Sequence, residues 1–186
     1  MAARIIVGLV GFRCCGKSTL RGMLSELGYP VFDTNSIRTG DSDANRISLD
    51  EVLHRYGGSE SYLHFIEGAL RDFVAHHEGI IFIDSLKVSA DASVLMEMFP
   101  DASLQLWYLH ASNDARLARY ANRDLVTNLR SEALETHDAA LERHGILSLI
   151  KSANEVIDMQ DDLSAVRLKV ERSLERLRKK TLDLHV

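Results

Sequence analysis

Four residues near the start of the chain have the types and spacing of a phosphate-binding loop. Gly11, Gly16, Lys17 and Ser18 fit the pattern G-x-x-x-x-G-K-[ST]. The glycines allow a tight turn whose backbone N–H groups point at a phosphate, and the dipole of a following helix favours that anion. The lysine ammonium would reach the β- and γ-phosphates, and the serine hydroxyl would ligate Mg²⁺. The pattern therefore predicts a site for a nucleoside triphosphate and Mg²⁺.

The segments on either side of this loop support the prediction. Residues 5–10 form an apolar run typical of a buried strand, and residues 18–24 have the pattern of a helix. The alternative is a glycine-rich turn that binds nothing, and it is disfavoured because all four defining positions are filled. The predicted nucleotide-binding residues of the loop are Gly11, Arg13, Cys14, Cys15, Gly16, Lys17, Ser18 and Thr19.

The two cysteines of the chain, Cys14 and Cys15, are adjacent and lie inside this loop. Neighbouring cysteines do not form a useful structural disulfide, so they indicate nothing about an oxidising compartment. A helix N-terminus and Lys17 could lower the pKa of either thiol and make it reactive. The interpretation we favour is that two small residues are tolerated where only the backbone matters.

Strand-like and helix-like segments alternate along the rest of the chain. This alternation predicts a parallel β-sheet with helices on both faces, that is, an α/β fold. Further strands are expected at residues 29–33, 79–84, 104–109 and 155–158. Helices are expected at residues 48–56, 59–77, 111–122, 131–143 and 163–180.

Two of these expected strands end in an aspartate, Asp33 and Asp84. Ligands of open parallel sheets bind at the carboxyl ends of the strands, where the phosphate-binding loop also lies. Asp33 is predicted to position, and to deprotonate, the hydroxyl of a phosphoryl acceptor, and its alternative role is to cap the next helix. Asp84 is predicted to hold Mg²⁺ or to contact the acceptor, with helix capping again as the alternative.

Arginines follow the second and fourth strands. Phosphoryl transfer depends on positioning and on charge neutralisation, which guanidinium groups supply. Arg38 is predicted to bind the acceptor, and Arg123, beside Asp124, to act in catalysis. For Arg116 and Arg119, a role at the phosphates and ordinary ion pairs on a solvent-facing helix are equally open.

The composition limits the range of functions. With 186 residues the chain has the length of one domain, and its net charge of −5 gives no electrostatic footprint for nucleic acid. No apolar run is long enough to span a bilayer, and no signal peptide precedes the first strand. We therefore expect a cytoplasmic protein without nucleic-acid or membrane partners, as a monomer or homodimer. The basic residues at 172–180 are interleaved with acids and are interpreted as a solvated helix face.

Three segments make the chain resemble a known family. They are the opening GLVGFRCCGKSTL with ELGYPVFD, the segment HASNDARLARYANRD, and the tail ALETHDAALERHGILSLIKSANEVIDMQDDL. Together they resemble the P-loop nucleotide kinases of the adenylate kinase-like group, and within that group dephospho-CoA kinase and dephospho-CoA-kinase-like proteins.

This resemblance implies a three-layer P-loop NTPase fold with a five-stranded parallel sheet in the order 2-3-1-4-5, and Mg·ATP as the phosphoryl donor. It also implies a pair of lid helices, placed at about 112–143 in a single kinase domain over residues 1–186. The helical segment after Asp33, at about 34–77, is interpreted as an acceptor-binding insert. In this resemblance Asp138 would lie on a helix that leads into a strand, and residues 159–162 would line the adenine. Arg119 is separately predicted to bind the nucleotide.

Two motifs depart from the family pattern. Asp33-Thr34-Asn35 stands where dephospho-CoA kinases have Asp-x-Asp, and Asp84-Ser85-Leu86-Lys87 stands where kinase-like relatives have Asp-Gly-x-Arg. The predicted substrate-binding residues are Asp33, Arg38, Asp84 and Lys87, and the predicted metal ligands are Ser18 and Asp84.

The predicted function is transfer of the γ-phosphoryl group of Mg·ATP to a small acceptor, such as a nucleoside monophosphate or dephospho-CoA. Lys17, Asp33 and Arg123 are the predicted catalytic residues. Two alternatives remain open: an NTP-binding switch with slow hydrolysis, and a lapsed enzyme that keeps the fold for binding alone.

Overall fold

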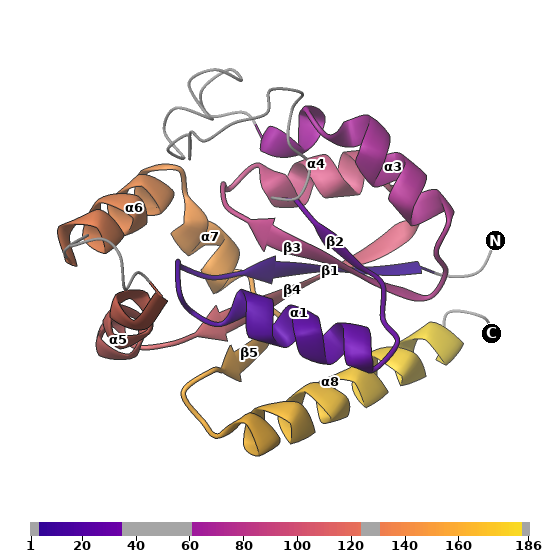
Figure 1. Cartoon of the computed structure of the whole chain (residues 1–186). Helices are drawn as coiled ribbons and strands as arrows, with labels where there is room; N and C mark the ends of the chain where they lie inside the picture. The colour runs from indigo at the N-terminus through magenta and orange to yellow at the C-terminus, as the bar shows by residue number, and fades with distance from the viewer. Residues whose placement is uncertain (1–3, 35–60, 124–130, 184–186) are drawn as a thin grey trace.

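Five parallel strands form one sheet in the order β2-β3-β1-β4-β5 (Figure 1), which confirms the expected order. The computed structural model describes residues 4–34, 61–123 and 131–183, and of residues 123, 131 and 181–183 it describes the backbone alone. The strands are β1 (Arg4–Val10), β2 (Val31–Asp33), β3 (Ile80–Leu86), β4 (Ala102–His110) and β5 (Glu155–Asp158).

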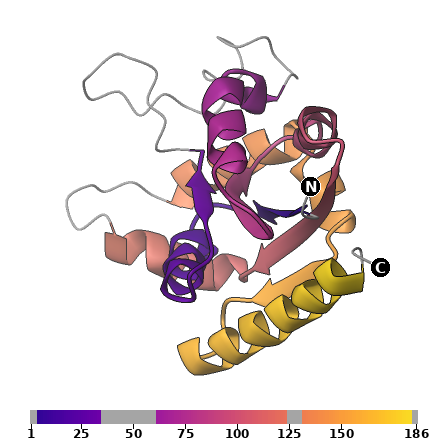
Figure 2. The same cartoon turned by 90° about the vertical axis from the view of Figure 1, so that its right-hand side faces the viewer.

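Helices cover both faces of this sheet, as the alternating pattern predicted (Figures 1 and 2). They are α1 (Lys17–Glu26), the 3₁₀ helix η1 (Tyr62–His64), α3 (Glu67–Ala75), α4 (Asp91–Met98), α5 (Asn113–Arg123), α6 (Ser131–Arg143), α7 (Ile146–Lys151) and α8 (Leu163–Asp183). On one face α1 and α8 pack against the sheet, and on the other face α3, α4 and α7 do so.

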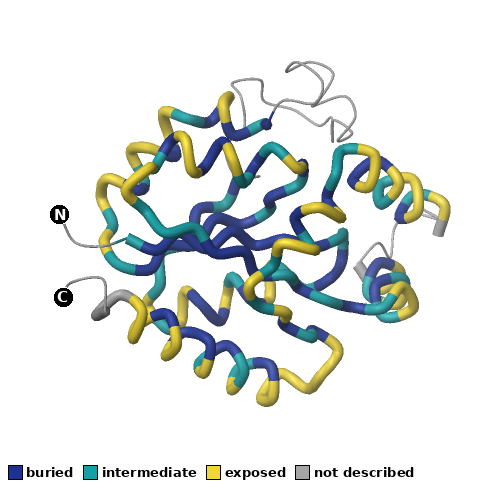
Figure 3. Tube along the Cα trace, turned by 180° about the vertical axis from the view of Figure 1, so that it is seen from behind, coloured by how far each residue is buried: buried dark blue, intermediate teal, exposed yellow. Residues whose placement is uncertain are grey.

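Strand β1 lies at the centre of the sheet and is buried on both faces (Figure 3). Its side chains alternate between the two cores: Ile5, Val7 and Leu9 pack with α1 and α8, whereas Ile6 and Val10 pack with α3 and α4. A strand covered on both faces needs apolar residues at successive positions, which explains the unbroken apolar run in the sequence. This central strand leads directly into the phosphate-binding loop.

Several boundaries differ from the sequence prediction. Strand β3 was expected to end at Asp84 and continues to Leu86. The helix expected at 59–77 is, in its described part, η1 followed by α3. Helices α4 and α7 were not predicted, because they have only 8 and 6 residues and so leave little helical periodicity in the sequence. The helix expected at 48–56 lies outside the described residues.

The proposed insert at 34–77 and the proposed lid at 112–143 are only partly described. Within the insert, α3 buries Leu70 and Val74 in the core beside β3, so this helix is part of the layer that covers the sheet. Within the lid, α5 and α6 lie together at the end of the sheet where the phosphate-binding loop lies (Figure 1). None of the described helices combines the length and apolar character needed to cross a membrane.

Candidate active site

The phosphate-binding loop connects the end of β1 to the start of α1. Gly16 has φ 108°, a backbone conformation that favours glycine. A Cβ atom on Gly11 would lie 2.7 Å from Cys15 Sγ and 2.9 Å from the carbonyl oxygen of Leu109. Both defining glycines are therefore required, one for its dihedral angle and the other for the close packing of the loop against β4.

The ammonium group of Lys17 lies across this loop. Its Nζ donates hydrogen bonds to the carbonyl oxygens of Gly11 at 2.6 Å and Phe12 at 3.0 Å, and it lies 3.5 Å from Cys15 Sγ. Ser18 and Thr19 are exposed in the first turn of α1. The charged amine thus lies over the backbone of the loop, beside the N-terminus of α1, and its contact with a triphosphate stays a prediction.

The two cysteines of the loop are buried. Cys14 is 8% exposed and Cys15 is 1% exposed. Cys14 also has φ 63°, which is uncommon for a residue other than glycine and marks the sharp turn of the loop. The two cysteine side chains are therefore packed inside the loop, and the interpretation that only the backbone matters at these positions stays a prediction.

Asp33 and Asp84 lie side by side at the end of the sheet where the loop lies. They are register partners on the adjacent strands β2 and β3. Arg21, on α1, forms an ion pair with Asp33 and has its Nη1 3.6 Å from Asp84 Oδ2. The sequence correctly predicted that both aspartates lie at this end of the sheet, but it did not single out Arg21. The missed signal was its spacing, since Arg21 follows Lys17 by one helical turn and so shares its face of α1.

Asp84 is the more buried carboxylate, with 3% of the residue exposed. Burial raises the pKa of its carboxyl group, an effect that Lys17 and Arg21 oppose and that the neighbouring Asp33 adds to. Its Oδ1 atom is buried and has no hydrogen-bond partner in the described part of the chain. A carboxylate oxygen that is buried without a partner, near Lys17 and the start of α1, is suited to bind a divalent cation or a water molecule of its hydration shell.

A bulge in β3 immediately follows Asp84. Leu9 pairs with Asp84 whereas Val10 pairs with Leu86, so Ser85 is the extra residue, and it has φ 78°. The hydroxyl of Thr34 donates a hydrogen bond of 2.8 Å to the carbonyl oxygen of Asp84. The bulge and this hydrogen bond hold the ends of β2 and β3 together beneath the two carboxylates.

Beyond the bulge, Lys87 and Asp91 anchor the turn that leads into α4. Asp91 is 3% exposed and accepts hydrogen bonds from the backbone N–H groups of Lys87 and Val88 and, at 2.6 Å, from the Ser61 hydroxyl. Burial lowers the pKa of Lys87, whereas Asp91 acts in the opposite direction. The Lys87 ammonium lies 5.8 Å from the ring centroid of Tyr62. Its predicted contact with substrate stays a prediction.

Arg116 and Arg119 of α5 donate hydrogen bonds to backbone carbonyl oxygens of the phosphate-binding loop. Arg116 is 7% exposed and donates to the carbonyl oxygen of Arg13 at 3.3 Å, while Arg119 donates to the carbonyl oxygens of Cys14 and Cys15 at the same distance. Arg119 also donates to the carbonyl oxygen of Met159. The solvent-facing alternative is therefore wrong for Arg116, and both arginines bind carbonyl oxygens of the loop. Their role at the phosphates stays a prediction.

An ion pair of 2.7 Å joins Arg116 on α5 to Asp138 on α6. The guanidinium of Arg116 also lies 5.1 Å from the ring centroid of Phe12, and that of Arg13 lies 5.2 Å from the ring centroid of Tyr120. These contacts connect both helices of the proposed lid to the loop.

His137, also on α6, was not predicted from the sequence. Burial lowers its pKa, and the positive charge of Arg13 lowers it further. Its Nδ1 atom is buried without a hydrogen-bond partner among the described residues. A single histidine on a helix carries no sequence pattern that would have singled it out.

Residues 159–162 follow β5 and lie beside the loop and α5. Met159 contacts Gly16, where an added Cβ would lie 2.9 Å from Met159 Cε. The backbone N–H of Ser112 donates to Gln160 Oε1 at 3.1 Å. Asp162 accepts hydrogen bonds from the backbone N–H groups of Ser164 and Ala165, both at 2.9 Å, and so caps α8. The adenine-side role of this segment stays a prediction.

The structure therefore brings together Gly11, Gly16, Lys17, Ser18, Thr19, Asp33 and Asp84, with Arg21 added. The predicted site residues Arg38 and Arg123 cannot be located relative to this group. Arg38 lies outside the described residues, and so does the side chain of Arg123.

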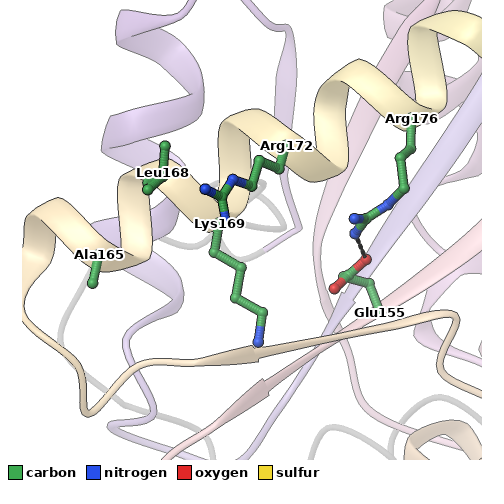
Figure 4. Close-up of a pocket in the computed structure, with 6 residues that line it drawn as sticks. All are labelled: Glu155, Ala165, Leu168, Lys169, Arg172 and Arg176. Atoms are coloured by element: carbon green, nitrogen blue, oxygen red, sulfur yellow. Dashed lines mark hydrogen bonds and ion pairs between the residues drawn. The ribbon is translucent and has the colours of Figure 1, made fainter.

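A separate groove lies between α8 and the edge strand β5 (Figure 4). It has a volume of about 390 Å³ and is lined by Glu155, Ala165, Leu168, Lys169, Arg172 and Arg176. Arg176 forms an ion pair with Glu155 across it. None of the predicted site residues lines this groove, so it is distinct from the candidate active site.

Comparison with known proteins supports a kinase relationship. The chain matches no family model. It is 25% identical over 202 residues to a dephospho-CoA kinase from Gloeobacter violaceus, with 94% of this chain and 93% of the relative covered.

Solved structures share the fold. A gluconokinase from Sinorhizobium meliloti superposes with a TM-score of 0.60 and 18% identity, over 99% of this chain and 97% of that one. The protein TT1252 from Thermus thermophilus has a TM-score of 0.64 and 19% identity, over 96% and 98%. A shikimate kinase from Bacteroides thetaiotaomicron has a TM-score of 0.51 and 18% identity, over 94% and 98%.

The sequence relationship covers nearly the whole chain, and the loop and the sheet order agree with it. The chain is therefore similar in sequence to a dephospho-CoA kinase over nearly its whole length, and it shares its fold with the gluconokinase.

Proposed function

We propose that the protein transfers the γ-phosphoryl group of Mg·ATP to the hydroxyl or phosphate of a small acceptor, a nucleotide or nucleoside-like molecule of the nucleoside monophosphate or dephospho-CoA type. The observation that carries the proposal is the pair of carboxylates, Asp33 and Asp84, beside the ammonium of Lys17 at the ends of β1, β2 and β3. The relationship to a dephospho-CoA kinase supports the choice of acceptor class.

In this proposal each residue has one role. Lys17 stabilises the negative charge that develops between the β- and γ-phosphates. Asp33 accepts a hydrogen bond from the acceptor hydroxyl and takes its proton as the acceptor oxygen bonds to the γ-phosphorus. The bond from that phosphorus to the β,γ-bridging oxygen breaks, and ADP leaves with its electron pair. Arg123 is proposed to act on the charge of the transferred group.

The metal and acceptor contacts complete the proposal. Ser18 and Asp84 would hold Mg²⁺, whose charge neutralises the phosphate oxygens when it is bound. Asp84 fits this role because its Oδ1 is buried and has no partner within the described ranges. Arg38 and Lys87 are proposed to bind the acceptor, while residues 34–77 and 112–143 are proposed to serve as acceptor insert and lid of a single domain.

The proposal is tested by ADP release from Mg·ATP with adenosine, AMP, CMP and dephospho-CoA as acceptors, with products identified by mass spectrometry. We expect one acceptor to accelerate ADP release and to gain a phosphoryl group. Lys17→Ala should abolish this transfer without unfolding the protein, because Lys17 is polar and only half-buried. Slow turnover that no acceptor stimulates would instead support the NTP-binding switch.

A further inference from the structure

Arg21 connects the helix of the phosphate-binding loop to both carboxylates. Its guanidinium forms an ion pair with Asp33 and lies 3.6 Å from Asp84 Oδ2. The side chain of Arg21 is 36% exposed, that of Asp33 24% and that of Asp84 5%. The arginine thus reaches from the rim of the site down to its most buried acid.

Asp33 and Asp84 can both stay ionised at neighbouring positions only if a cation lies close to them. Adjacent strands place Asp33 directly beside Asp84, and like charges at this separation repel each other. The Lys17 ammonium is already hydrogen-bonded to the carbonyl oxygens of Gly11 and Phe12. The Arg21 guanidinium instead donates a hydrogen bond to the Asp33 carboxylate and lies near that of Asp84.

We propose that Arg21 is a positioning residue of the phosphoryl-transfer reaction, which holds the Asp33 carboxylate at the end of β2 in the orientation that receives the acceptor hydroxyl. This inference rests on the proposed function, because it assigns Arg21 to the residue that acts on the acceptor. Arg21 acts through Asp33 and need not touch ATP.

The ion pair with Arg21 constrains the orientation of the Asp33 carboxylate. Asp33 is the last residue of a three-residue edge strand, so the strand alone constrains its side chain little. Arg21 lies on α1, which begins at the phosphate-binding loop, and the ion pair therefore fixes the carboxylate relative to the donor phosphates. Small misplacements of a reacting group cost large factors in rate, so an arginine in this position affects catalysis through geometry.

The test compares Arg21→Met and Arg21→Lys with the unchanged protein. ADP release from Mg·ATP is followed with whichever of adenosine, AMP, CMP and dephospho-CoA stimulates it most and, separately, with water as the sole acceptor. Arg21→Met should lower kcat by about 10- to 100-fold and leave the KM for ATP within about threefold, because positioning is lost while donor binding is kept. Arg21→Lys should recover part of the rate, since lysine keeps the charge without the planar fork.

A second variant, Asp33→Asn, identifies the residue through which Arg21 acts. If Arg21 positions Asp33, adding Arg21→Met to Asp33→Asn should lower kcat no further. If Arg21 instead acts on the phosphates independently, the two reductions should multiply, which would overturn the inference. The matched control is Arg167→Met, which removes an exposed arginine that pairs with Glu26 near the far end of α1 and should leave kcat unchanged.

The outcomes separate the inference from the function on which it rests. If none of adenosine, AMP, CMP and dephospho-CoA stimulates ADP release from the unchanged protein, the proposed function is refuted, and the inference with it. An active protein in which Arg21→Met keeps kcat within about twofold would refute the inference alone.

Discussion

The ion pair between Arg116 and Asp138 offers a measurable test of how α5 and α6 are held to the loop. The side chains are 8% and 14% exposed, and the charged atoms are 2.7 Å apart. Removing one partner of a buried pair leaves a buried charge without its counterion. We therefore expect Asp138→Ala to lower the free energy of unfolding by about 3 kcal/mol, the lower end of the range for buried pairs because Asp138 keeps some contact with solvent.

The assay is urea denaturation followed by circular dichroism, on Asp138→Ala, Arg116→Met and the double variant. The two losses should not add, since each single variant already breaks the same pair. The pair of Arg167 with Glu26, whose side chains are 44% and 65% exposed, provides the comparison. Arg167→Met should cost less than about 1 kcal/mol. If Asp138→Ala costs no more than this surface variant, the reasoning from burial is refuted.

Three further predictions concern the site. Gly16→Ala should lower the free energy of unfolding by about 1–3 kcal/mol because φ is 108°, whereas Gly22→Ala, at an exposed position of α1 with no atom within 4 Å of the added Cβ, should not destabilise the protein. Folding raises the pKa of Asp84 above 3.8, so the folded form binds this proton more tightly and stability falls as the pH rises through the folded pKa. Asp84→Asn should therefore stabilise the protein at neutral pH, with a gain that disappears below pH 3.8; a gain independent of pH in denaturation curves would contradict this. Cys14 and Cys15 should react slowly with a thiol reagent in the native protein and rapidly in urea, because they are 8% and 1% exposed; equal rates would show that the loop opens readily.

The sequence alone predicted the phosphate-binding loop, the alternation of strands and helices, and the position of two acids at strand ends. These features depend on contiguous residues. A loop that wraps phosphates needs glycines and a lysine at fixed spacing, and a strand buried on both faces needs an unbroken apolar run. The sheet order came from a family resemblance, and the structure confirms it.

Only the tertiary structure decided how side chains from separate segments meet. Arg21 reaches Asp33 and Asp84 because α1 packs beside β2 and β3. Arg119 binds the loop carbonyl oxygens because α5 packs beside the loop. Short helices such as α4, and the bulge at Ser85, also left no readable pattern in the sequence. The physical reason is that local periodicity determines which segments become strands and helices, whereas pairing between distant charges depends on strand register and helix packing, which no single segment contains.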